Sequence, residues 1–225
     1  MGPGHAASLD VNPVRVDITN PGQPTELRLT NTGSDELSVQ VDARQWTQNQ
    51  EGADRLSLTD LLLAVPPLFS LPAGEQQIVR IGYIGAPNED EEMSFRLIVT
   101  ELAPEATTAN RSALNMRLQL SIPVFVAPSA TAPQPELIVE SARATDDGTL
   151  VTLRNVGNSH TRLNAVDLLA ETGWSPMPEG VGLLRYLLPE SRVELRLPKS
   201  AGRARAVRVT SADGRSWEHA VQLAP

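Results

Sequence analysis

The chain has 225 residues, of which 40% are hydrophobic and 20% are charged, and its formal net charge is −8. This length suits one large domain or two domains of ordinary size, and the composition excludes a disordered acidic chain. The negative charge argues against a nucleic-acid partner, and the absence of cysteine excludes both a disulfide framework and a cysteine-based zinc site.

Short segments of alternating apolar and polar residues run through most of the chain. Residues 26–30 and 37–41 are two of them, and residues 193–197 repeat the pattern near the end. This period of two is typical of β-strands with one buried face. The stretch 58–65 is long enough for a helix, but two prolines follow it, and we interpret it as strand or irregular structure. Turn signals separate these segments at residues 20–22, 31–33, 72–74, 147–148 and 213–214.

Many short strands with regular turns predict an all-β protein built from sandwiches. Residues 128–135 contain three prolines among small residues, which is typical of a semi-rigid linker and not of a core strand. We therefore predict two β-sandwich domains in tandem, at residues 8–128 and 136–225, joined by a linker at 129–135.

A short motif recurs in the two predicted domains. Leu-Thr-Asn-Thr-Gly at 29–33 resembles Leu-Arg-Asn-Val-Gly at 153–157, and each ends an alternating segment. Asparagine and glycine are common where a strand meets a turn, so the match is weak by itself. Its similar place in both halves favours two domains of similar fold.

Motifs of catalytic or metal-binding chemistry are missing from the sequence. The histidines His5, His160 and His219 lie far apart, and we interpret them as ordinary surface residues. There is no nucleophile elbow and no glycine-rich phosphate loop. The acidic run at 88–92 lacks the ligand spacing and central glycine of a calcium loop. We therefore predict no catalytic residue, no metal site and no cofactor, and a protein that is not an enzyme.

The longest alternating segment runs from residue 114 to residue 126. It would form a strand of about 13 residues, more than twice the usual length. One interpretation is a long core strand within its own sandwich. The other is that part of the strand faces outward and offers its face and edge to another protein, and the pattern leaves both open. The apolar positions are Leu114, Met116, Leu118, Leu120, Ile122, Val124 and Val126.

Several segments of the first predicted domain share their order and spacing with a known family. They are Ser8–Asp10, Asn12–Val16, Leu29–Gly33, Gln45–Thr47, Pro66–Gly74, Val79–Ile81, Phe95–Pro104 and Ile122–Pro128. Together they resemble the periplasmic pilus-assembly chaperones of the chaperone–usher pathway, the PapD-like family. The resemblance covers about residues 8–128, and the second predicted domain is similar only in size and strand pattern.

This resemblance implies two immunoglobulin-like β-sandwich domains in an L-shaped arrangement around a cleft. It also implies a non-enzymatic chaperone of the periplasm, so we expect a signal peptide to have been removed. Subunits of pili and fimbriae are incomplete sandwiches, and the chaperone's long strand fills their gap by donor-strand complementation before they reach an outer-membrane usher. The donated side chains would be Leu114, Met116, Leu118 and Leu120, with the first three markedly more exposed in the free chain than Val124 and Val126.

The family holds the subunit's C-terminal carboxylate with an arginine on the first strand and a lysine on the long strand. Arg15 matches the arginine, so the resemblance implies a carboxylate anchor in the cleft. Pro123 stands at the lysine position, and the only lysine in the chain is Lys199. Ala127 replaces a basic residue that often precedes the final proline. With these departures the chain resembles the archaic members of the family, whose long strand ends in Ile-Pro-Val-Phe-Val. Because the lysine is missing, we expect a second donor in this chain from a backbone N–H or another arginine.

Two other kinds of protein fit parts of the pattern. An adhesive or structural surface protein is the main alternative, but such a subunit should lack a complete first domain or carry a self-donating N-terminal extension. Here the long strand is internal and a second domain follows, which favours the chaperone. A carbohydrate-binding sandwich is disfavoured because only 4% of residues are aromatic. Since an exposed apolar strand aggregates, a self-capping homodimer of the free chaperone is a further expectation.

Overall fold

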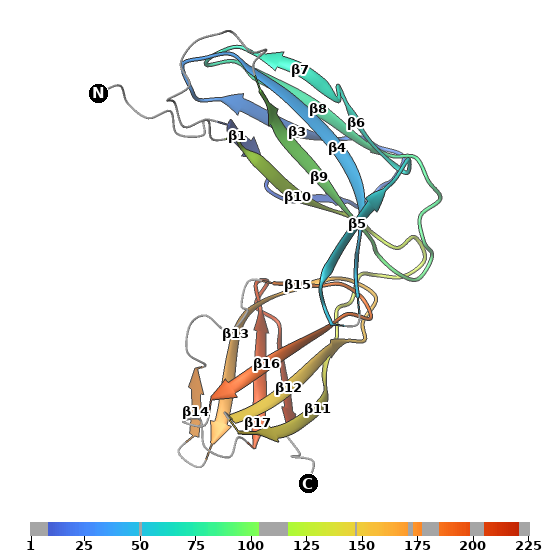
Figure 1. The fold of residues 1–225 in the computed structure, drawn as a ribbon. Helices are drawn as coiled ribbons and strands as arrows, with labels where there is room; N and C mark the ends of the chain where they lie inside the picture. Colours follow the sequence, from blue (N-terminus) through green and yellow to red (C-terminus); the bar gives the residue numbers. More distant parts are fainter. Residues whose placement is uncertain are drawn as a thin grey trace, which may run out of the picture. The chain divides into compact units, whose positions relative to one another are not determined.

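The computed structural model describes residues 9–49, 51–103, 117–146, 148–170, 173–176, 185–198 and 205–220. Every regular element within these ranges is a β-strand, as the ribbon in Figure 1 shows. No membrane-crossing helix is found in the same ranges.

The described residues group into two compact units. The first contains the residues up to Trp46 together with Leu56–Asn88 and Met93–Ala127. The second contains Thr47–Arg55, Glu89–Glu92 and the residues from Pro128 onward. Two short segments of the first half of the chain, the first of which includes strand residues, are therefore part of the second unit.

The strands of the first half form two sheets. One has the order β1-β3-β8-β6, and the other has the order β2-β10-β9-β4-β5 with β7 also paired to β4. All these pairings are antiparallel where the register is known, except that β2 runs parallel to β10. The bounds are β1 Leu9–Asn12, β2 Val16–Ile18, β3 Thr25–Asn31, β4 Leu37–Gln48, β5 Asp54–Leu58, β6 Leu62–Val65, β7 Leu68–Leu71, β8 Gln76–Tyr83, β9 Met93–Leu102 and β10 Gln119–Val126.

The core of the first unit lies between these two sheets. Leu27 and Val79 enter it from the first sheet, and Phe95, Leu97 and Val124 enter it from the second. All five side chains are fully buried. Because full burial of one large apolar side chain contributes about 1.5–3 kcal/mol, the alternation seen in the sequence is enough to hold the two sheets face to face.

The second unit is also a sandwich of two sheets. One has the order β11-β12-β16, and the other has the order β14-β13-β17-β18 with β15 paired to β13. A single cluster of buried apolar side chains, including Leu153 and Val209, draws on both sheets. The bounds are β11 Leu137–Thr145, β12 Gly148–Asn155, β13 Thr161–Ala170, β14 Gly173–Pro176, β15 Tyr186–Leu187, β16 Arg192–Pro198, β17 Ala206–Ser211 and β18 Ser216–Ala220.

The predicted all-β architecture of two sandwiches is confirmed. The ambiguous stretch 58–65 contains β6, which is a strand and not a helix. The predicted turn at 213–214 joins β17 to β18, and Gly214 has a φ of 84°, which suits glycine. The boundaries at 8–128 and 136–225 and the L-shaped arrangement stay predictions.

The repeated asparagine motif ends one strand in each unit, and Asn31 shows its role in the first. Its Nδ2 donates to the carbonyl oxygens of Leu71 at 2.9 Å and Asp35 at 2.7 Å. Its Oδ1 accepts a hydrogen bond from the N–H of Gly33 at 2.9 Å. The side chain is fully buried; its bond to Leu71 is buried and its bonds to Asp35 and Gly33 are partly buried, so it satisfies backbone groups that have little access to water.

Asn155 makes the same set of bonds in the second unit. Its Nδ2 donates to the carbonyl oxygens of Ser159 at 2.8 Å and Leu187 at 3.1 Å. Its Oδ1 accepts from the N–H of Gly157 at 3.1 Å. The weak sequence repeat therefore corresponds to one hydrogen-bonded turn used twice.

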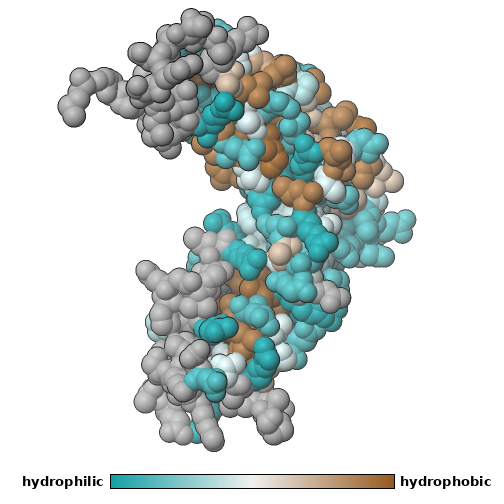
Figure 2. Space-filling view, viewed as in Figure 1, coloured by the Kyte–Doolittle hydropathy of each residue, from teal (hydrophilic) through white to brown (hydrophobic). Residues whose placement is uncertain are grey.

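Apolar side chains also remain on the surface of the first unit. Leu63 and Val65 of the edge strand β6 and Leu68 of β7 are 44%, 55% and 59% exposed. Figure 2 shows hydrophobic residues gathered over these two strands on the visible face. Leu63 lies in the sheet that does not contain β10 and serves below as an exposed reference position.

Removal of either buried asparagine amide should destabilise the protein. We expect Asn31→Ala and Asn155→Ala each to lower the free energy of unfolding by about 1–3 kcal/mol, because buried backbone groups lose a hydrogen-bond partner. Asn20→Ala is the matched control, since Asn20 accepts one bond in an exposed turn, and should change it by less than about 0.5 kcal/mol. The free energy of unfolding of each variant is measured by urea denaturation. Equal decreases for all three substitutions would contradict the role of the buried asparagines.

Candidate functional site

Strand β10 is paired unequally on its two edges. Along its whole length, from Gln119 to Val126, it pairs with β9. On the other edge β2 pairs only with Val124, Phe125 and Val126. Among the described residues, the segment 119–122 therefore has a strand partner on one edge only. Figure 1 shows β10 beside β9 in the first unit.

Two backbone hydrogen bonds show which residues point to which edge. The carbonyl oxygen of Leu118 accepts from the N–H of Glu101, which lies in β9, at 2.9 Å. The N–H of Ala127 donates in the opposite direction, to the carbonyl oxygen of Ile18 in β2, at 3.0 Å. Since backbone groups alternate between edges along a strand, even-numbered residues bond to β9. The N–H and C=O groups of Gln119 and Ser121 therefore face the open edge.

The core-facing side chains of β10 change environment along the strand. Ile122, Val124 and Val126 are 4%, 0% and 1% exposed. Leu120 is half-buried and packs against the margin of the same core. Leu118, which immediately precedes β10, is half-buried outside that cluster. The C-terminal half of β10 closes its own sandwich, and the apolar side chains become less buried toward Leu118. The other two predicted donor residues, Leu114 and Met116, lie outside the described residues.

Arg15 lies in a bend between β1 and β2, and not within a strand. Its Nε donates to Oδ2 of Asp17 at 2.9 Å, and about half of each side chain is exposed. Val16 lies beside Val124 in the parallel register, so Arg15 is level with Pro123. The predicted anchor Arg15 therefore stands beside Pro123, at the position where the family resemblance implies a lysine.

Two further arginines lie in the same row of this sheet. Pro123 pairs with Arg96 of β9, and Arg96 pairs with Arg44 of β4. Directly opposed residues of antiparallel strands project to the same face. The neighbouring pair Val124 and Phe95 points into the core, so Arg96 and Arg44 project from the other face. We call Arg15, Arg96 and Arg44 the arginine row.

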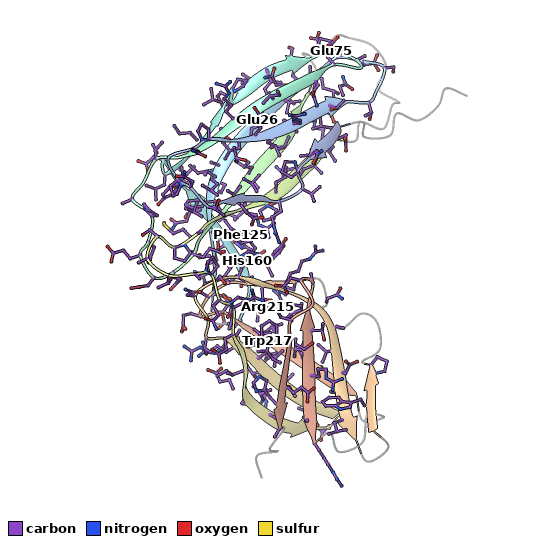
Figure 3. All side chains as sticks on the ribbon, turned by 180° about the vertical axis from the view of Figure 1, so that it is seen from behind. Glu26, Glu75, Phe125, His160, Arg215 and Trp217 are labelled. Carbon is purple, nitrogen blue, oxygen red and sulfur yellow. The ribbon has the colours of Figure 1, made fainter. Side chains whose placement is uncertain are left out.

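A pair of aromatic side chains packs against Arg96, which lies at the centre of the arginine row. The guanidinium carbon of Arg96 lies 3.7 Å from the centroid of the Trp46 ring, which is buried. The ring of Trp46 in turn lies 5.9 Å from that of Phe125, which is labelled in Figure 3. Stacking on an aromatic face restricts a guanidinium while leaving its N–H groups, which lie in the guanidinium plane, able to bind a carboxylate. The arginine row therefore offers planar cationic donors where Pro123 offers none.

Sequence reasoning identified Arg15 but missed Arg96 and Arg44. Alternation around Phe95 and Leu97 signals that Arg96 faces away from the core. No sequence signal shows that it stands level with Arg15, because that depends on how β9, β10 and β2 pair.

The histidines are less isolated than the sequence predicts. His160 is half-buried, and its Nδ1 lies 2.7 Å from Oε1 of Glu92, a buried carboxylate 68 residues away in sequence. His219 is also half-buried, with Nε2 at 2.6 Å from the carbonyl oxygen of Leu137. The prediction of ordinary surface histidines is therefore wrong for both. Across the described ranges, no group of three or more potential ligands could hold a metal ion.

The first half of the chain matches a known family. The family described as "Pili and flagellar-assembly chaperone, PapD N-terminal domain" matches residues 8–132, which is more than half of the chain. This protein belongs to that family. No match is found among curated protein sequences.

Solved structures of pilus and fimbrial chaperones share the fold of this family member. One is in the CsuC–CsuE chaperone–tip subunit pre-assembly complex from archaic Csu pili of Acinetobacter baumannii, at 22% identity and a TM-score of 0.72, covering 97% of this chain and 100% of that one. Another is in the Salmonella enterica SafA pilin–SafB chaperone complex, with 19% identity and a TM-score of 0.64. The match covers 96% of this chain and 98% of that one. The Escherichia coli chaperone DraB is 19% identical with a TM-score of 0.63, covering 96% and 97%.

These comparisons confirm the predicted family and the two-domain immunoglobulin-like fold. The family is one of assembly chaperones, and structural relatives have been solved with a pilin or a tip subunit. The similarity extends over nearly the whole chain, including the second unit, which the sequence resemblance did not reach.

Proposed function

We propose that this protein is a periplasmic chaperone that binds pilus or fimbrial subunits by donating β10, stabilises them and delivers them to an outer-membrane usher. The observation that carries the proposal is the unequal pairing of β10. Gln119 and Ser121 point to an edge without a described partner strand, while Val124 and Val126 close the protein's own core. A strand with one free edge and partly covered apolar side chains suits addition to an incomplete sheet.

The donated side chains would fill the groove of a subunit that lacks one strand. We assign this role to Leu114, Met116 and Leu118, and Leu120 would lie at the boundary with the chaperone's own core. Burial of each side chain contributes about 1.5–3 kcal/mol before the entropy of ordering is subtracted. The backbone of the same strand would pair with the subunit's open edge, which would otherwise promote aggregation.

The subunit's terminal carboxylate would bind at the arginine row. Arg15 supplies one guanidinium, and Arg96 is the best placed second donor because it stands opposite Pro123 and is held on Trp46. A guanidinium fork can bind a carboxylate through two parallel hydrogen bonds. Arg96 would thereby take the role of the lysine that the family carries at the position of Pro123.

The alternative of an adhesive or structural surface protein is less well supported. In a subunit that needs a donated strand, the first sandwich would be open. Here β10 pairs with both β9 and β2, and its C-terminal half completes the first core. The chain thus provides its own strand and still has an edge to offer. A self-capping homodimer through that edge remains part of the proposal for the free protein.

Loss of the anchoring arginines should weaken subunit binding without unfolding the chaperone. We expect Arg15→Ala and Arg96→Ala each to reduce affinity about tenfold or more, because a charged hydrogen-bonded partner is removed. Arg28→Ala is the matched control, since Arg28 is a half-exposed arginine of the other sheet paired with Glu26. Affinity is measured with a purified subunit in titration calorimetry. Unchanged binding by Arg15→Ala would contradict the anchor.

Leu118→Glu should separate binding from folding. A charge entering a dry subunit groove is costly, so we expect complex formation to be lost. The melting temperature should change little, because Leu118 lies outside the buried core cluster. Val124→Glu, within β10, should unfold the first domain, and Leu63→Glu, at an exposed position of β6, should affect neither property. Co-purification from the periplasm and thermal melting test this. A Leu118→Glu protein that fails to fold would show that Leu118 belongs to the core.

A further inference from the structure

Pro123 lies in the interior of β10, where proline is unusual. Proline has no backbone N–H and is normally confined to edges, strand ends and bulges. Yet β10 pairs with β9 through eight consecutive residues, Pro123 among them, and Pro123 is buried. A central proline that leaves the pairing intact needs a specific geometric reason.

The alternation of backbone directions supplies that reason. Even-numbered residues of β10 bond to β9, as the bond from Glu101 N–H to Leu118 shows. Pro123 has the parity of Gln119, Ser121 and Ala127, whose backbone groups point to the other edge. Its missing N–H therefore removes a donor from the open edge and none from the β9 ladder.

Pro123 also marks the point where the open edge ends. The next residue, Val124, is the first to pair with β2. Along β10 from its N-terminal end, a strand added to this edge first pairs with the N–H groups of Gln119 and Ser121. It then meets a position without an N–H, and immediately afterwards the edge is occupied by β2.

We propose that Pro123 is a register stop, which limits how far a subunit strand can pair along β10. This inference rests on the proposed function and specifies the register of the complex. A subunit strand shifted forward by two residues would place a carbonyl against Pro123 and leave it without a donor. Shifts of one residue are excluded because they exchange the two faces of the strand. The stop would leave the end of the subunit strand level with Arg15 and Arg96, beside the arginine row.

Disulfide cross-linking can read this register directly, because the natural chain contains no cysteine. The probe is a subunit encoded beside this protein's gene, carrying single cysteines along its C-terminal strand and co-expressed in the periplasm. With Gln119→Cys in the chaperone, we expect one subunit position to dominate. Adding Pro123→Ala should populate a second position, two residues further along, at a tenfold or greater increase over its background. An unchanged single position would overturn the register stop.

Ser121→Pro provides an independent test that does not alter a buried residue. Ser121 is exposed and its N–H faces the open edge, so the substitution should leave the β9 ladder and the melting temperature nearly unchanged. It moves the stop two residues earlier, and the dominant cross-link to Gln119→Cys should shift by two subunit positions or be lost. An unshifted cross-link would contradict the proposal. If the protein with only Gln119→Cys captures no subunit at all, the proposed function itself is contradicted.

Discussion

Each residue of β10 directs its backbone hydrogen-bonding groups to one side of the strand. The even-numbered residues bond to β9 and hold β10 in the first sandwich, which frees the odd-numbered groups for another neighbour. From Val124 onward that neighbour is β2, which belongs to the same chain. Before that point, at Gln119 and Ser121, no strand among the described residues pairs with this second edge of β10. A single strand can therefore belong to two sheets, provided that its own domain does not use all of its second edge.

The position of the arginine row follows from the same strand pairing. The register that aligns β2, β10, β9 and β4 also aligns Arg15, Pro123, Arg96 and Arg44. Trp46 and Phe125 occupy the adjacent positions on that face and support the guanidinium of Arg96. Under the proposed function, a proline at position 123 does not simply remove an anchor, because Arg96 on the neighbouring strand would supply the second cation and the proline would limit how far a subunit strand pairs.

The sequence predicted the fold well because periodicity and turn chemistry are local. It predicted the alternation of β10 correctly but could not show where the strand leaves its own core, since Leu118 and Val124 follow the same pattern. It identified Pro123 only as a departure from a family pattern, because the direction of its missing N–H depends on the pairing with β9. The contact between His160 and Glu92 was beyond sequence reasoning for a similar reason, since 68 residues separate them.

Residue-resolved amide hydrogen exchange on β10, in the free chaperone and in its complex with a subunit, tests the central claim most directly. In the free protein, the amides of Ile122 and Val124 should exchange slowly because they face β9, and those of Gln119 and Ser121 should exchange fast. In the complex, Gln119 and Ser121 should become protected while Ile122 and Val124 change little. Protection of Gln119 and Ser121 already in the monomeric free protein, or fast exchange of both in the complex, would contradict the account.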